Sequence, residues 1–87
     1  MSAEAYRTAI AEFEEIRREV VAVADALTRL AECLRDHPMR LKTTSTDLQS
    51  ALHLEELLTR FEDARERARA AYLEMPSTTR RDFEPPP

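Results

Sequence analysis

Two residues of this sequence have the types and spacing of part of a metal site. His53 and Glu56 stand three positions apart, which places both side chains on one face of a helix. Helical bundles that bind two metal ions use Glu-x-x-His pairs together with glutamates from neighbouring helices. Here the order is reversed, and the facing stretch adds only Glu32 and Asp36. A solvated histidine beside a solvated glutamate accounts for the pattern, so we predict neither a metal ligand nor a cofactor.

The single cysteine, Cys33, is the other candidate for chemistry. A catalytic thiol needs a basic neighbour. The nearest candidate is His37, and the acid Asp36 stands between them. Cys33 falls on an apolar helix face, where a buried and inert thiol is expected. One cysteine allows no disulfide within the chain, which suits a reducing compartment. We therefore predict no catalytic residue and a non-enzymatic protein.

Arginines cluster in the C-terminal half, where they could form a basic strip. Acidic residues alternate with them, so a solvated face with ion pairs is the simpler interpretation. Earlier in the chain, Asp25 and Arg29 have the i, i+4 spacing of such a pair. The net charge is −4 and no region is strongly basic, which argues against nucleic-acid binding. The clustered residues are Arg60, Arg65, Arg67 and Arg69, with Glu62, Asp63, Glu66 and Glu74 between or beside them.

A heptad pattern predicts the first of the elements that carry these residues. From Tyr6 to Leu34, apolar residues recur at alternating steps of three and four, as in a helix that packs against another helix. Pro38 disfavours helical geometry at the residue before it, so the helix is expected over about residues 3–36. The run is Tyr6, Ala9, Phe13, Ile16, Val20, Val23, Leu27, Leu30 and Leu34.

A second helix is predicted over about residues 47–75, where the apolar residues again have helical spacing and Pro76 follows. Residues 37–46 form a short connection, which makes the two helices antiparallel neighbours. The chain has no glycine, which disfavours tight strand turns and phosphate loops. We predict an all-α fold, a coiled-coil-like antiparallel two-helix hairpin over residues 1–75. Large side chains such as Phe13 should meet small ones such as Ala64 of the second helix.

The apolar stripes are too broad for one partner helix at the end near the connection. There they cover more than half of the circumference of each helix, and exposed apolar surface of this kind usually marks an interface. A homodimer or higher homo-oligomer that completes a helical bundle would cover it, and so would the groove of a different protein. The predicted interface residues are Val20, Val23, Leu27, Leu30, Leu34, Leu48, Leu52, Leu54, Leu57, Leu58 and Phe61.

Residues 76–87 are predicted to form a flexible, proline-rich tail. Phe83 is its one large apolar side chain, which is too little to form a core. The three closing prolines favour an extended backbone. Arg80, Arg81 and Phe83 could act as a docking peptide with Phe83 as its anchor. A disordered chain end is the alternative interpretation.

Composition and pattern together favour a protein that works by association. No apolar run approaches the length that spans a bilayer, so no membrane contact is expected. The N-terminus lacks the basic start and apolar stretch of a signal peptide, and we expect a cytoplasmic protein. We predict a small acidic protein that acts through protein–protein interaction, as an oligomerising or adaptor subunit. The alternative is a small acidic regulator or inhibitor that binds one target protein by occlusion.

Overall fold

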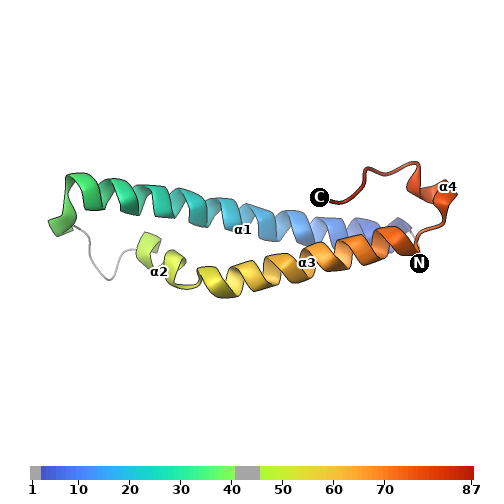
Figure 1. Ribbon diagram of the computed structural model, residues 1–87, viewed down its shortest axis with the longest axis horizontal. Coiled ribbons are helices and arrows are strands. Elements are labelled where there is room, and N and C mark those ends of the chain that lie inside the picture. Colours follow the sequence, from blue (N-terminus) through green and yellow to red (C-terminus); the bar gives the residue numbers. More distant parts are fainter. Residues whose placement is uncertain (1–2, 41–45) are drawn as a thin grey trace.

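The long helix α1, Ala3–Asp36, runs along most of the molecule (Figure 1). The computed structural model describes residues 3–40 and 46–87, and these residues form α-helices, one 3₁₀ turn and no strands. Glu4 lies in the first turn of α1 and Arg35 in the last, where each charge opposes the partial charge of that helix end. The molecule measures 59 × 18 × 14 Å. Its longest dimension is only slightly greater than the length of α1, which is about 50 Å at about 1.5 Å per residue.

Helix α3, Leu54–Glu74, packs beside α1 and runs in the opposite direction (Figure 1). One core cluster joins Phe13 and Ile16 of α1 to Ala64 of α3, and the rings of Phe13 and Phe61 meet edge to face at 5.0 Å. The predicted contact between large side chains of the first helix and alanines of the second is therefore confirmed. Because alanine is small, the two helix backbones can approach closely while the larger rings fill the space.

The second predicted helix is interrupted, which differs from the continuous helix expected over residues 47–75. Helix α2, Thr46–Leu52, ends at a turn centred on His53, and α3 begins at Leu54. The N–H of His53 donates to the carbonyl of Ser50 at 3.3 Å, a bond one residue shorter than an α-helix requires. No glycine or proline marks this position, so the sequence carries no local signal of the break.

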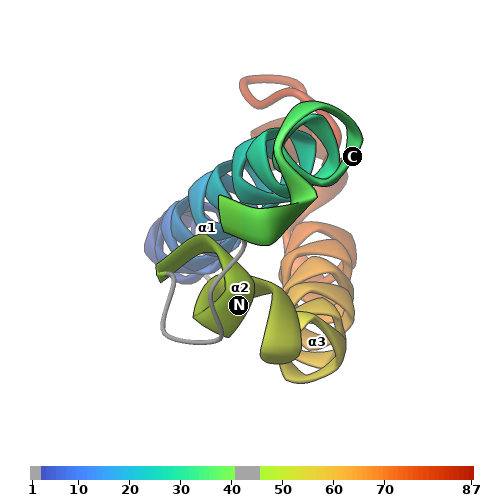
Figure 2. The same ribbon diagram turned by 90° about the vertical axis from the view of Figure 1, so that its left-hand side faces the viewer.

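A bidentate ion pair joins α1 and α2. The guanidinium of Arg29 donates two hydrogen bonds to the carboxylate of Asp47, at 2.9 and 2.7 Å. Side-chain hydrogen bonding in this pair lowers the pKa of Asp47 and raises the pKa of Arg29. Arg29 thus bonds across to another helix, whereas its spacing predicted a pair with Asp25. Figure 2, which looks along the molecule, shows α2 displaced from the line of α3.

The chain reverses direction after each long helix. After α1 comes a short 3₁₀ turn, η1 (Pro38–Arg40), and residues 41–45 of the predicted connection lie outside the described residues. After α3, Pro76 precedes the single turn α4, Ser77–Arg80, and the C-terminal end returns beside α1 (Figure 1). Phe83 and Glu84 of the C-terminal segment, residues 77–87, contact Tyr6 of α1, and the composition of the predicted tail, residues 76–87, gave no indication of these contacts.

Candidate functional site

The residues with chemical potential lie apart from one another. His53 is exposed at the turn between α2 and α3, where it borders an open hollow of about 470 Å³ with Ser50, Glu56 and Arg60. Cys33 is half-buried rather than fully buried, and its thiol donates to the carbonyl of His37 at 3.5 Å. Residues 3–40 and 46–87 contain no group of three or more His, Cys, Asp or Glu side chains placed to hold a metal ion.

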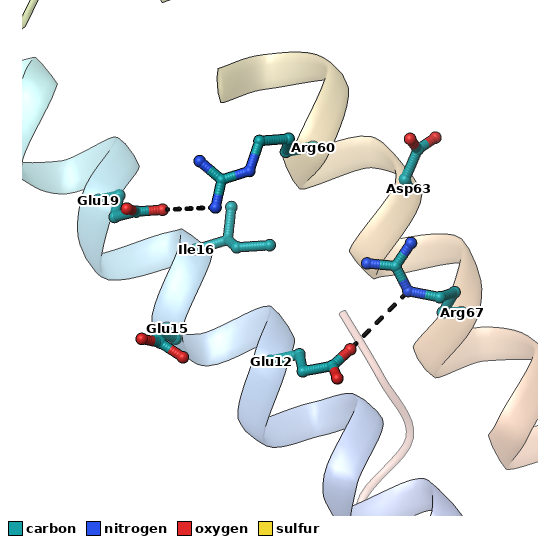
Figure 3. A pocket seen from close by; sticks show the side chains of 7 residues that line it. All are labelled: Glu12, Glu15, Ile16, Glu19, Arg60, Asp63 and Arg67. Carbon is teal, nitrogen blue, oxygen red and sulfur yellow. Dashed lines mark ion pairs between the residues drawn. The ribbon is translucent and has the colours of Figure 1, made fainter. Parts of the chain in front are cut away.

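One side of the α1–α3 pair carries ion pairs, and we call it the ion-pair flank (Glu12, Glu19, Arg60 and Arg67). Arg60 contacts Glu19 at 3.3 Å and Arg67 contacts Glu12 at 3.9 Å, each across the groove between the helices (Figure 3). All four side chains are about half exposed, so each pair contributes little to stability. Arg60 and Arg67 therefore form ion pairs with acidic residues of α1, which agrees with the simpler interpretation of a solvated face with ion pairs.

The other edge of the α1–α3 interface shows a gradient of exposure along a single row of heptad positions of α1. Tyr6 and Phe13 are 4% and 2% exposed, whereas Leu27 and Leu34, further along the same row, are 40% and 55% exposed. In the neighbouring row, Ile16, Val23 and Leu30 are all buried, with exposed fractions of 9%, 8% and 9%. The same heptad pattern is thus covered at one end of α1 and open at the other.

The position of α2 explains why this row opens. Near the connection, α2 contacts α1: Asp47 bonds to Arg29, and Ser50 lines the same hollow as Glu19 and Ala22. Because Glu19 and Arg60 both line that hollow, α2 continues along the ion-pair flank. The break at His53 therefore moves the second chain segment away from the row of Leu27 and Leu34, and no described residue covers those two leucines to the extent that Tyr6 is covered.

Helix α3 places one exposed leucine on the same side of the helix pair as the exposed leucines of α1. Tyr72 contacts Tyr6, with ring centroids 5.5 Å apart, and Leu58 lies two heptads before Tyr72. Because α3 runs opposite to α1, Leu58 falls on the side of the pair where Leu27 and Leu34 are exposed. Leu58 is 44% exposed. We call this surface the apolar flank (the half-buried Val20, with Leu27, Leu34 and Leu58).

The predicted interface residues divide into three groups in the structure. Val23, Leu30 and Leu57 are buried within the single chain, and their part in an interface stays a prediction. Val20, Leu48, Leu54 and Phe61 are half-buried. The last group, Leu27, Leu34, Leu52 and Leu58, is exposed.

The C-terminal segment contributes contacts that the sequence did not reveal. Phe83 is half-buried, and its ring meets Tyr6 edge to face at 5.5 Å under the guanidinium of Arg7 at 5.3 Å. Arg80 lies 6.0 Å from the centre of the Tyr72 ring and donates to the carbonyl of Met75 at 3.0 Å. Of the three predicted docking residues, Arg81 alone is exposed. The sequence gave one signal of these contacts: Phe83 is the only large apolar residue of the segment, and such a side chain tends to pack against other apolar groups.

Comparison with known proteins gave no match: no protein-family model matches the sequence, and no curated protein or solved structure matches it. Among the helices that the structure describes, none has the length and apolarity to cross a bilayer.

Proposed function

We propose that this chain is a non-enzymatic interaction protein, a helical hairpin that associates with a second copy of itself through the apolar flank. The observation that carries the proposal is the exposure of Leu27 and Leu34, which continue the heptad row that Tyr6 and Phe13 bury. Rows of this kind bury their side chains when another helix packs against them. Among residues 3–40 and 46–87, no helix covers Leu27 and Leu34 in this way.

A second copy is the partner whose shape matches the flank most directly. The flank includes positions from both long helices, so an isologous pair would set two helices against two and complete a four-helix bundle. Val20 and Leu58 would then lie inside the bundle with Leu27 and Leu34. Such a dimer also addresses a weakness of the monomer, because a chain of 87 residues buries a small share of its surface.

Sedimentation of a charged variant tests this proposal. A Leu27→Glu/Leu34→Glu double variant should remain helical and sediment as a monomer, while the wild type sediments as a dimer at micromolar concentration. Leu73 offers a matched control because it is also an exposed leucine, at 67%, but lies outside the flank. Leu73→Glu should dimerise like the wild type. A wild-type chain that remains a monomer at micromolar concentration would contradict self-association.

A monomeric wild type would instead favour the alternative, a small acidic regulator that binds one target protein and blocks its surface. Two exposed apolar side chains outside the flank support this candidate: Met39 in η1 and Leu52 in α2 are 93% and 73% exposed. Together with a net charge of −4, they give the connection end an apolar tip on an acidic molecule. In that case Met39→Ser with Leu52→Ser should weaken binding to the target, and the flank variant should not.

A further inference from the structure

The C-terminal segment is attached to the helices by contacts with residues of both α1 and α3. Phe83 packs on Tyr6 and under Arg7 of α1, and the carbonyl of Glu84 accepts a hydrogen bond of 2.8 Å from the Tyr6 hydroxyl. Arg80 reaches Tyr72 of α3. These four contacts join side chains or carbonyls of residues 77–87 to the two long helices, so none of them depends on the segment being part of the same chain.

The C-terminal segment is also joined to the helical core by only a short extended link and few apolar contacts. Met75 and Pro76 link it to α3 with extended backbone angles, ψ 145° and 148°. Its one helical turn, α4, has no buried residue. Phe83 is its main apolar contact with the helices, packed against the cluster of Tyr6, Ala71 and Met75. A short segment with a single anchor and an extended hinge is typical of a docked peptide.

We infer that Tyr6, Arg7 and Tyr72 form a peptide-docking groove, filled here by the chain's own C-terminal segment, and that the groove accepts the same segment from a second copy. The recognised pattern is an arginine three residues before a phenylalanine, followed by a residue whose backbone carbonyl accepts the hydrogen bond from Tyr6. The phenylalanine enters between Tyr6 and Arg7, and the arginine lies over Tyr72. When two copies exchange this segment, no new kind of contact is required, because each contact within one chain forms again between the two chains.

In a single chain the groove stays occupied, because tethering gives the segment an effective concentration on the order of millimolar. A variant whose own segment lacks the anchor should therefore bind a separate copy of the segment. This surface is distinct from the apolar flank, and its occupancy is measured without reference to the oligomeric state. The inference and the proposed function can thus fail independently.

A titration with a peptide tests the inference. The probe is a fluorescently labelled, N-acetylated peptide of residues 77–87, added to the full chain carrying Phe83→Ala and followed by fluorescence anisotropy. The peptide should bind this variant at least about 10-fold more tightly than it binds the wild type, whose groove is filled. A peptide that itself carries Phe83→Ala should not bind. In a Tyr6→Phe/Phe83→Ala chain, affinity should fall about 5-fold, because the hydrogen bond to Glu84 is lost.

Circular dichroism of each variant comes first, and Phe83→Leu replaces Phe83→Ala in the titration if the alanine variant loses its helices. Absence of peptide binding to a helical variant would overturn the inference. Equal affinity for wild type and variant would also overturn it, since the peptide would then be adhering elsewhere. If both variants unfold, the segment is an integral part of the core and the inference is wrong.

Discussion

The hydroxyl of Tyr6 donates a hydrogen bond of 2.8 Å to the backbone carbonyl of Glu84, which ties the first turn of α1 to a residue 78 positions later. Burial raises the pKa of this hydroxyl, and the neighbouring Tyr72 and Glu84 raise it further. The environment therefore favours the neutral, hydrogen-bond-donating form of Tyr6. Because Phe83 packs on the same ring, this bond and the aromatic contact act together to hold the C-terminal segment in place.

Replacing Tyr6 by phenylalanine should weaken this attachment while preserving the packing of the ring. We expect a loss of about 1 kcal/mol in the free energy of unfolding, the usual contribution of one partly buried hydrogen bond. Urea denaturation followed by circular dichroism measures it. Tyr72→Phe is the matched control, since that chain keeps the bond between Tyr6 and Glu84. A loss in the control equal to that in Tyr6→Phe would mean that the bond contributes nothing specific.

Alkaline pH should release the same bond. The folded-state pKa of Tyr6 lies above its ordinary value, so the stabilisation is fully present below about pH 10 and is lost as the pH rises through the raised value. We expect the wild type to lose stability across this range by more than the Tyr6→Phe chain does. Denaturation at a series of alkaline pH values makes the comparison, and identical pH profiles for the two chains would contradict it.

Two leucines of α1 that look alike in the heptad pattern should differ in their contribution to stability. Leu30 is 9% exposed and Leu34 is 55% exposed. Leu30→Ala should cost about 2–5 kcal/mol, because it leaves a cavity in the core. Leu34→Ala should change the stability of the monomer by about 0.5 kcal/mol or less. Urea denaturation compares the two variants at protein concentrations too low for association. A loss under about 0.5 kcal/mol for Leu30→Ala would show that Leu30 is not buried in the core.

Acid should loosen α2 from α1. Its hydrogen bonds with Arg29 lower the pKa of Asp47 in the folded state, so their contribution is present above about pH 4 and is lost as the pH falls through the lowered value. Since α2 has no buried residue, this pair matters for its placement. Hydrogen exchange should show the amides of α2 losing protection in acid.

The variant Asp47→Asn should show reduced protection of α2 already at neutral pH and no further acid step. Asp25→Asn serves as the control, because the two hydrogen bonds between Arg29 and Asp47 remain in that chain. If Asp47→Asn protects α2 as well as the wild type does at neutral pH, packing alone positions this helix.

The sequence by itself determined the all-helical class and the extent of the first helix. The heptad run from Tyr6 to Leu34 and the proline at position 38 are local signals, and α1 has the bounds they predict. The contact of Phe13 and Ile16 with Ala64 also followed from spacing, because a short connection between two helices leaves few alternatives for their pairing.

Only the tertiary structure decided which members of the heptad row are exposed, where the second helix breaks, and what the C-terminal segment does. Leu27 and Tyr6 occupy equivalent heptad positions, yet Tyr6 is covered by Phe83 while α2 packs on a different side of α1 from Leu27. Position 53 carries no glycine or proline, and Arg29 bonds to Asp47 of α2 although the two residues are 18 positions apart. Periodicity specifies that a side chain faces a neighbour, whereas burial depends on contacts between distant residues, and a pattern of near neighbours does not encode those contacts.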